Sequence, residues 1–311
     1  MEAHARYERL LEYCKALPPL PVAVAHPCDA SSLGGAIEAA GMGLIAPILV
    51  GPRARIEAVA AEHGIVIDGC EVVDAPFSEA AAEVAVGLVR EGRAEALMKG
   101  SLHTDELMAA VVKREAGMRT ARRISHCFVM DVPGHEQALI ITDAAINIAP
   151  TLEDKVHIVQ NAIDLAHALM VDEVRVAILS AMETINPKVP STIEAAAICK
   201  MVDRRQITGA LVDGPLALDN AIDMQAATVK QIDSPVAGRA NVLVVPDLEA
   251  GNMLAKSLSF LAGADAAGIV LGARVPIILT SRADSVLSRL ASCAVAVLVA
   301  RARRENAKIM G

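Results

Sequence analysis

A hydroxyl and a guanidinium stand side by side in Thr280-Ser281-Arg282, near the carboxyl end of the chain. They follow an apolar stretch, residues 277–279, that is predicted to be a buried strand. Arginine offers a planar fork of donors that fits the oxygens of a small oxyanion, and ligands of open α/β sheets bind at the carboxyl ends of the strands. The pair therefore predicts an oxyanion site. The alternative is that Arg282 is a surface cation near the start of the next helix.

Small-residue turns recur in the middle of the chain, and each is expected to follow a strand. They are Thr142-Asp143, Asp213-Gly214-Pro215, Ser234-Pro235-Val236-Ala237-Gly238, and Asp247 with Gly251-Asn252. Strand ends of one sheet would gather these turns along one rim, where glycine permits close approach of a ligand to the backbone. Ordinary turn chemistry explains each turn singly, but it explains four on the same rim less easily.

Several longer blocks occur in a fixed order along the chain. They are MKGSLHTDELMAAVVKREAGMRTARRISH (98–126), ITDAAINIAPTLEDKVHIVQNAI (141–163), DGPLALDNAI (213–222), SPVAGRAN (234–241), VPDLEAGNMLAK (245–256), LAGADAAGIVLGARVPI (261–277) and TSRADS (280–285). Through these blocks the chain resembles the phosphate acetyltransferase and phosphate butyryltransferase family. The resemblance extends from about residue 21 to about residue 299 and therefore covers nearly the whole chain.

This resemblance implies reversible transfer of a short-chain acyl group, acetyl or butyryl, between coenzyme A and inorganic phosphate. Coenzyme A would be a substrate, and no permanently bound cofactor is expected. By the same resemblance Ser281 hydrogen-bonds the reacting oxygens and Arg282 holds the phosphate. Acyl transfer passes through a tetrahedral oxyanion, and donors aimed at that charge are the main catalytic contribution in such chemistry.

The thiol of coenzyme A needs a proton acceptor when it attacks an acyl phosphate. Acetyl-specific members of the family have an aspartate seven residues after the serine, and that position is Ser288 here. Asp284 is the substitute candidate, although it could instead be the N-cap of the last helix. If no side chain accepts the proton, orientation and electrostatics would have to supply the rate.

A second small-residue turn, Lys99-Gly100-Ser101 with His103-Thr104, joins a predicted strand to a predicted helix. Free backbone N–H groups at such a helix start can bind a phosphate or thioester oxygen, so we expect these residues to contact substrate. His103 could equally be a structural histidine. The family often has an arginine in the following helix, and this chain has none there. The remaining candidates for holding the coenzyme A phosphates are Arg119, Arg122 and Arg123, which could instead form a solvated basic patch.

Other classes of enzyme find less support. Asp219 and Asp223 have the spacing of one helix face, but they lack accompanying ligands, so no metal site is expected. Neither GxxxxGK[ST] nor GxGxxG occurs, which disfavours ATP hydrolysis and NAD chemistry. Two alternatives stay open: a metal- and nicotinamide-dependent dehydrogenase of similar architecture, and a non-catalytic subunit that binds acyl-CoA.

Composition limits the partners. The 311 residues are 54% hydrophobic but only 2% aromatic, and the formal net charge is −8. Few stacking side chains and a negative charge exclude nucleic-acid binding. The six cysteines form no C-x-x-C pair, which favours reduced thiols, and no apolar run reaches the about 20 residues of a membrane span. We therefore expect a soluble cytoplasmic protein that does not bind membranes.

Short apolar strands alternate with Ala-rich helices, which predicts a three-layer α/β/α fold with a parallel sheet. Strands are expected at 21–25, 46–50, near 72, 96–98, 127–131, 138–142, 174–179, 210–212, 242–245 and 277–279. Helices are expected at 31–41, 53–63, 78–91, 105–114, 151–169, 192–203, 220–229, 253–261 and 285–303.

The domain organisation comes from the resemblance alone. It implies two domains with mainly parallel sheets and an interdomain cleft, the architecture of isocitrate and isopropylmalate dehydrogenases. The first domain would be residues 1–145 plus 268–311 and would contain Ser281-Arg282. The second, residues 146–267, would pair through its helices in a homodimer.

Overall fold

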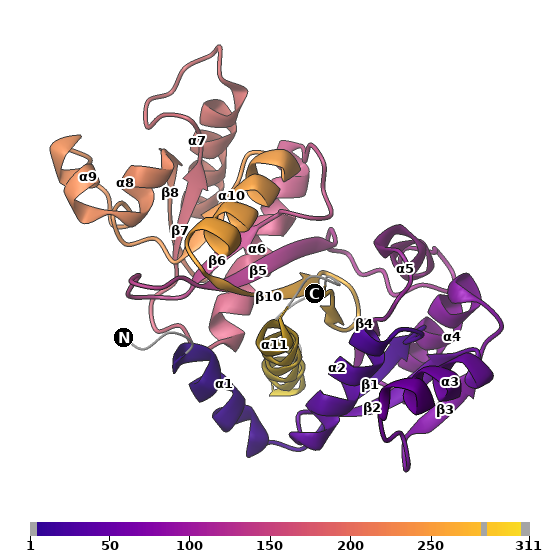
Figure 1. The fold of residues 1–311 in the computed structure, drawn as a ribbon. Coiled ribbons are helices and arrows are strands. Elements are labelled where there is room, and N and C mark those ends of the chain that lie inside the picture. Colours follow the sequence, from indigo (N-terminus) through magenta and orange to yellow (C-terminus); the bar gives the residue numbers. More distant parts are fainter. Residues whose placement is uncertain (1–4, 281–284, 306–311) are drawn as a thin grey trace. The chain divides into compact units, whose positions relative to one another are not determined.

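The computed structural model describes residues 5–280 and 285–305 and divides the chain into two compact units. We call them the terminal unit, made of the described residues before 123 and after 266, and the central unit, residues 123–266 (Figure 1). The division expected from the resemblance, with crossings near Ala145 and Gly268, stays a prediction.

The sheet of the terminal unit has the strand order β3-β2-β1-β4-β11-β10. Its strands are β1 Leu20–Ala25, β2 Ile45–Gly51, β3 Glu71–Asp74, β4 Ala96–Lys99, β10 Asp265–Leu271 and β11 Ile277–Ile278. All neighbours from β3 to β11 are parallel, and β10 runs antiparallel to β11. The parallel strands therefore end along one shared edge, where α/β proteins bind their ligands.

Helices cover both faces of this sheet. They are α1 Ala5–Lys15, α2 Ala30–Gly41, α3 Arg53–His63, α4 Ser78–Arg90, α5 Thr104–Val111 and α11 Val286–Glu305. Helix α2 contacts α3 and α11, whereas α4 contacts β1, β2 and α5. The middle of α11, Ala-Ser-Cys-Ala-Val-Ala-Val-Leu-Val-Ala, is apolar on every side and is fully buried, as expected of a helix without a polar face.

The strands of the central unit have the order β5-β6-β9-β7-β8. The strands are β5 Ser125–Asp131, β6 Leu139–Thr142, β7 Arg175–Leu179, β8 Leu211–Leu216 and β9 Val242–Val244. Only the β5–β6 pair is antiparallel. The helices are α6 Leu152–Ala168, α7 Pro190–Asp203, α8 Leu218–Ile222, α9 Met224–Val229 and α10 Leu248–Leu261.

The predicted fold class is confirmed: the described residues form a mixed α/β protein with mainly parallel strands covered by helices. Several elements differ from the prediction; α10, for example, begins at Leu248 instead of residue 253. Helix α1 and strand β10 were not expected, and the helix expected at 220–229 is two short helices that meet at Asp223. No helix of the described residues is long and apolar enough to cross a membrane.

Candidate active site

Two loops meet at the carboxyl edge of the terminal unit's sheet. Strands β1 and β4 are paired in parallel, with Ala25 opposite Lys99. Beyond them, the N–H of Gly100 donates to Ala25 O at 2.9 Å, and the N–H of Ser101 donates to His26 O at 2.8 Å. A Cβ at position 100 would lie 2.3 Å from Ala25 O, so only glycine allows this approach of the two backbones.

The Ser101 hydroxyl is the centre of a small polar network. It donates to His26 O at 2.8 Å and lies 2.9 Å from Nδ1 of the His26 ring. The N–H of Cys28 donates to Ser101 Oγ at 3.3 Å. The sequence had indicated Ser101 as a substrate contact, and its neighbour His26 was not among the predicted site residues.

His26 is buried, with 7% of its surface exposed, and has φ of 54°. Burial, followed by the positive charge of Arg55, lowers its pKa below the ordinary value for histidine, although Glu106, Asp29 and Glu79 oppose the shift. The ring is therefore neutral near pH 7. Burial also raises the pKa of the neighbouring Cys28 thiol to about 11, which keeps it protonated.

The other residues of the predicted Lys99–Thr104 turn have local partners. His103 is exposed and is the N-cap of α5, and its backbone N–H donates to Glu106 Oε2 at 3.2 Å. Lys99 Nζ donates to Gly100 O at 3.4 Å. Thr104 is the first residue of α5. The structural interpretation of His103, as a residue that ends the loop and begins the helix, therefore has direct support.

Strand β11 brings the chain to the same edge, since Ile278 pairs in parallel with Met98. The predicted catalytic residues Ser281, Arg282 and Asp284 follow in the sequence and lie outside the described residues. Ser285 is the residue that caps α11, because its hydroxyl accepts from the N–H of Ser288 at 3.1 Å. The capping role considered for Asp284 thus belongs to its neighbour.

The central unit has a second strand-end turn, after β6. Asp143 is buried, and its carboxylate accepts from the N–H groups of Ala145, Ile146 and Asn147 at 3.0, 3.0 and 3.2 Å. Its fourth donor is Asn147 Nδ2 at 2.6 Å. Thr142 donates from its hydroxyl to His126 O at 2.8 Å. This carboxylate is fully occupied in holding the turn.

Three further predicted residues join the turn after β6, because β9 runs parallel to β6 and ends beside it. Asp247 caps α10 by accepting from the N–H of Ala250 at 2.8 Å. A Cβ on Gly251 would lie 3.0 Å from Asp143 O. Asn252 Nδ2 donates to Ala144 O at 3.3 Å. Gly251 and Asn252 lie inside α10 instead of in a turn before it. That these residues share a ligand-binding rim with the turn after β6 stays a prediction.

The prediction is wrong for the other two turns. Asp213, Gly214 and Pro215 lie within β8 instead of following it. Ser234 and Gly238 follow helix α9, and the N–H of Gly238 donates to Asn220 O of α8 at 2.8 Å. The turn at 213–215 was predicted to follow a strand because the Gly214-Pro215 step suggested that the strand ends at residue 212, whereas β8 continues to Leu216.

The three candidate cations are divided between the units. Arg123 belongs to the central unit, where its Nε donates to Asn147 Oδ1 at 2.8 Å and its Nη1 lies 3.4 Å from Asp154 Oδ1. Arg119 and Arg122 belong to the terminal unit, and Arg119 is exposed beside its backbone bridge to Ala273. The contacts of Arg123 are those of a residue that holds a loop, and its assignment to the coenzyme A phosphates stays a prediction.

A second buried histidine, His126, was also not among the predicted site residues. His126 in β5 is 1% exposed, its Nδ1 is buried without a hydrogen-bond partner among the described residues, and its ring meets Phe128 at 4.3 Å between centroids. Burial lowers its pKa to about 4, with the Asp143 charge opposing the shift. Both histidines follow or occupy buried strands, which was the sequence signal available for them.

Asp219 and Asp223, the acidic pair considered as a metal site from the sequence, have different partners in the structure. Asp219 of α8 pairs with Lys230 at 3.1 Å, whereas Asp223 caps α9 by accepting from the N–H of Ala226 at 2.7 Å. The two residues do not share one helix face, contrary to their spacing. Within the described part of the chain, no group of three His, Cys, Asp or Glu side chains could hold a metal ion.

Comparisons with known proteins agree with one another. The model of a family described as phosphate acetyl/butaryl transferase matches residues 76–297. A phosphate acetyltransferase of Rhizobium meliloti is 66% identical over 300 residues, covering 96% of this chain and 95% of that protein. A phosphate butyryltransferase of Clostridium beijerinckii is 39% identical over 294 residues, covering 94% and 97%. The crystal structure of a branched-chain phosphotransacylase from Enterococcus faecalis V583 has a TM-score of 0.79 at 31% identity, covering 90% and 99%.

Proposed function

The chain belongs to the phosphate acetyl/butaryl transferase family, and we propose that acetyl is the acyl group it prefers. It is a transferase that moves a short-chain acyl group between coenzyme A and inorganic phosphate. One observation supports acetyl most strongly. The relative at 66% identity, matched along almost its whole length, is a phosphate acetyltransferase, whereas the butyryltransferase of Clostridium beijerinckii is 39% identical.

The terminal unit supplies the reaction centre in this proposal. Ser281 hydrogen-bonds the reacting oxygens, and Arg282 holds phosphate with its two-pronged guanidinium. The Lys99–Thr104 loop adds substrate contacts, supported by its position at the carboxyl edge of β4, next to β11. Arg119 and Arg122 are the proposed partners of the coenzyme A phosphates. Donors fixed before the reaction stabilise the tetrahedral oxyanion more than water would.

The turns after β6 and β9 in the central unit are the second proposed source of contacts. Their support is the close packing of Gly251 on the backbone of Asp143 and Ala144, which brings the two chain segments together.

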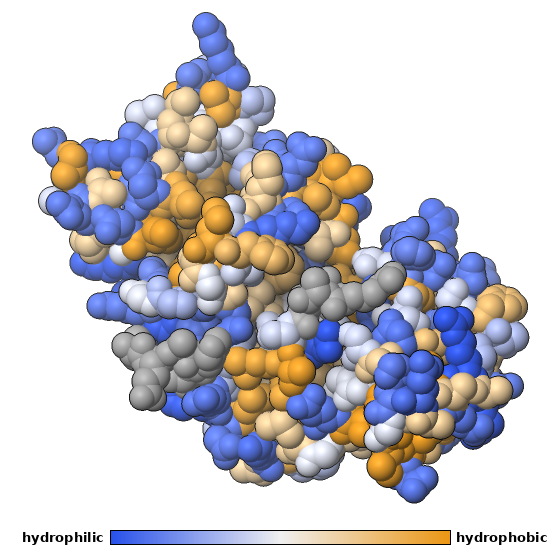
Figure 2. All heavy atoms as spheres, in the orientation of Figure 1, coloured by the Kyte–Doolittle hydropathy of each residue, from blue (hydrophilic) through white to orange (hydrophobic). Residues whose placement is uncertain are grey.

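We also propose a homodimer. Apolar side chains of α9 and α10 are exposed on the central unit, namely Val229, Met253, Phe260 and Leu261, and Figure 2 shows hydrophobic surface among hydrophilic side chains there. Light scattering at micromolar concentration should give twice 32.4 kDa; a mass of 32.4 kDa would exclude it.

Specificity constants for acetyl-CoA and butyryl-CoA, measured side by side at saturating phosphate, test the acyl preference. We expect acetyl-CoA to be favoured by about tenfold or more, since butyryl is longer by two methylenes and each changes binding by about 1–3 kcal/mol. A preference for butyryl-CoA would contradict the proposal. Binding of either ester without turnover would instead indicate a non-catalytic acyl-CoA-binding subunit.

The Arg282→Lys variant tests the reaction centre. Lysine keeps the charge but loses the bidentate fork, so turnover should fall about a hundredfold and apparent phosphate affinity should weaken. The KM for acetyl-CoA should change much less, because the nucleotide would bind elsewhere. Near-normal turnover would show that Arg282 is not the phosphate clamp.

A further inference from the structure

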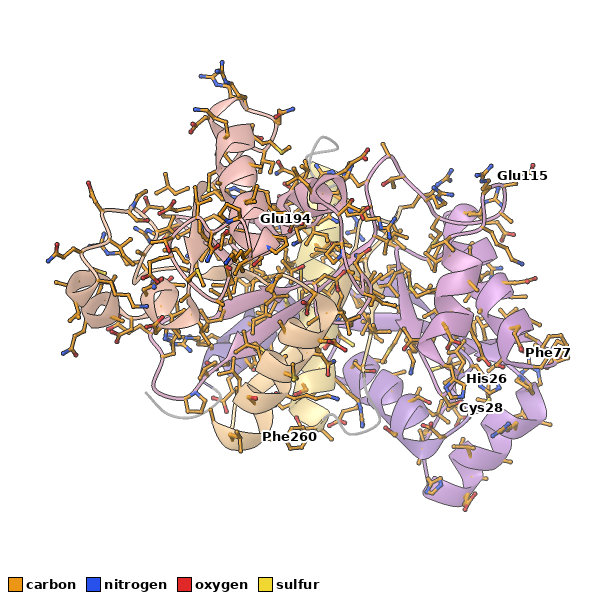
Figure 3. All side chains as sticks on the ribbon, turned by 90° about the horizontal axis from the view of Figure 1, so that it is seen from above. His26, Cys28, Phe77, Glu115, Glu194 and Phe260 are labelled. Atoms are coloured by element: carbon orange, nitrogen blue, oxygen red, sulfur yellow. The ribbon has the colours of Figure 1, made fainter. Side chains whose placement is uncertain are left out.

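His26 has an unusual position for a buried histidine of the terminal unit. It follows β1 directly, at the carboxyl edge of the sheet, and it contacts the Lys99–Thr104 loop through Ser101. Figure 3 shows it beside Cys28 in the terminal unit. Its backbone has φ of 54°, a left-handed conformation that most side chains avoid. The chain thus holds this imidazole in a defined place at the edge where ligands of such sheets bind.

The hydrogen bonds around Ser101 determine which ring nitrogen of His26 carries the proton. A carbonyl can only accept, so the single proton of the Ser101 hydroxyl is used on His26 O, 2.8 Å away. The contact of 2.9 Å between Ser101 Oγ and His26 Nδ1 must then have Nδ1–H as its donor. In the neutral ring this leaves the lone pair on Nε2. No described residue gives Nε2 a hydrogen bond.

The charges around the ring come from four helices or their caps. Arg55 of α3 disfavours the protonated ring, and burial acts in the same direction. Glu106 of α5, Glu79 of α4 and Asp29, the N-cap of α2, favour the protonated ring but do not outweigh burial and Arg55. The pKa of His26 consequently lies below 6.5, so that the ring is a neutral base at pH 7 and can be protonated transiently.

The position at which acetyl-specific members of the family have an aspartate gives no acid or base here. Ser288 occupies it, is buried in the first turn of α11, and lies 3.1 Å from the Ser285 hydroxyl. A serine hydroxyl does not accept a thiol proton near neutral pH without a base of its own. We propose that His26 Nε2 carries the proton between the coenzyme A thiol and the phosphate oxygen, an inference that rests on the proposed function.

The proton balance of the reaction fits one neutral base. In the direction of acyl-CoA synthesis, Nε2 takes the thiol proton while sulfur bonds to the acyl carbon of the acyl phosphate. The acyl carbon–oxygen bond then breaks, and the imidazolium returns the same proton to the departing phosphate oxygen. The products are acyl-CoA and hydrogen phosphate, and His26 ends neutral as it began. The reverse direction uses the same steps in reverse order.

The variant His26→Asn isolates this role. Asparagine tolerates the left-handed backbone better than most residues, and its Nδ2–H₂ can replace the Nδ1–H donor toward Ser101. Asparagine has no side-chain group that can accept the thiol proton. His63→Asn, at the exposed end of α3, is the matched control and should behave as wild type. The assay follows acetyl-CoA formation from acetyl phosphate and coenzyme A from pH 5 to 8, with the KM of both substrates.

Wild type should lose kcat as pH falls, with a midpoint below 6.5, because protonated His26 cannot accept the thiol proton. His26→Asn should lose about a hundredfold in kcat, the scale of a general base, with KM changed less than about threefold. The fall of kcat at low pH should also disappear in this variant.

A kcat of His26→Asn equal to that of wild type, or an unchanged fall of kcat at low pH, would overturn the proposal. If His26→Asn does not fold, a flat wild-type profile between pH 5 and 7 overturns it and the acid limb supports it. An inactive wild type would refute the proposed function itself.

Discussion

The turns after β1 and after β6 both follow the carboxyl ends of strands, one in each unit, yet their polar groups are used differently. After β6, both oxygens of Asp143 are saturated by four donors from the same turn. After β1, His26 makes one ring hydrogen bond and leaves Nε2 without a described partner. Position at a strand end therefore does not identify a reactive residue. A count of satisfied donors and acceptors excludes some candidates, since a buried group with its partners complete has nothing left for a substrate.

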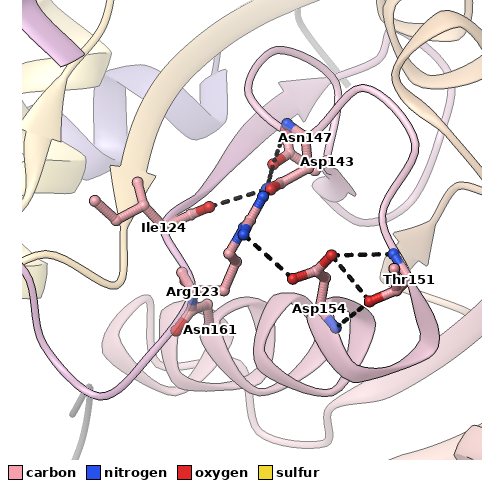
Figure 4. A network of polar contacts seen from close by, with 7 residues as sticks. All are labelled: Arg123, Ile124, Asp143, Asn147, Thr151, Asp154 and Asn161. Carbon is pink, nitrogen blue, oxygen red and sulfur yellow. Dashed lines mark hydrogen bonds and ion pairs between the residues drawn. The ribbon is translucent and has the colours of Figure 1, made fainter. Parts of the chain in front are cut away.

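The same distinction, between groups with complete and incomplete partners, applies to Arg123. Arg123 reaches Asn147 and Asp154, and Asn147 in turn donates to Asp143 and to Ile124 O at 2.9 Å (Figure 4). This chain of contacts ties β5, the turn after β6 and the start of α6 together. The central unit's edge is thus a self-contained polar network, and substitutions there should change stability more than chemistry.

The largest expected effect on stability is that of Asp143→Ala. Removing the carboxylate leaves four donors in and around a buried turn without their acceptor, which should lower the free energy of unfolding by about 4 kcal/mol. Urea unfolding measures the change. An unchanged midpoint would mean that the turn is held by other contacts and that the contrast with His26 fails.

His126 should make the stability depend on pH. Its folded pKa, about 4, lies below its unfolded value near 6.5, so the unfolded chain binds the extra proton first. Stability from this residue is complete above pH 6.5 and is lost as pH falls toward 4, by about 3 kcal/mol. Urea midpoints from pH 7 to 4.5 should fall less steeply in His126→Phe than in wild type. Parallel curves would contradict the assignment.

Gly100→Ala should destabilise the terminal unit by about 2 kcal/mol, because the new Cβ meets backbone oxygens of Ala25 and His26 at 2.3 and 2.5 Å. Activity should fall as well, since the loop and His26 would move apart. Gly87→Ala is the control: this glycine lies inside α4 with no atom within 4 Å of a Cβ, and the change should stabilise slightly. Equal free energies of unfolding and equal activities of the two variants would show that the close approach of the backbones at Gly100 is unimportant.

The smallest effect should come from Arg123→Ala, at about 1 kcal/mol of stability, because its side chain is 54% exposed and its ion pair is screened. The KM for coenzyme A should be unchanged. Arg119→Ala should instead raise that KM without changing the urea midpoint. A raised KM for coenzyme A in Arg123→Ala, with an unchanged KM in Arg119→Ala, would instead assign Arg123 to the coenzyme A phosphates.

Much of the fold could be predicted because the strands are apolar runs bounded by turns, and the helix at 53–63 was predicted to the residue. Strand β10 was not predicted because Asp265-Ala266-Ala267-Gly268 has the composition of a loop, and its strand conformation depends on pairing that the sequence does not show. Helix α1 hides its apolar face, Tyr7, Leu11 and Cys14, among charges. His26 could not be singled out, because nothing in the sequence shows that Ser101 lies beside it.

The most direct test of acyl transfer to phosphate follows both products at once. Wild-type protein is given acetyl-CoA, and released thiol and acetyl phosphate are quantified with phosphate absent and saturating. We expect no thiol without phosphate and, with phosphate, one acetyl phosphate for each thiol. Thiol release at the same rate without phosphate, or no release under either condition, would contradict the assignment.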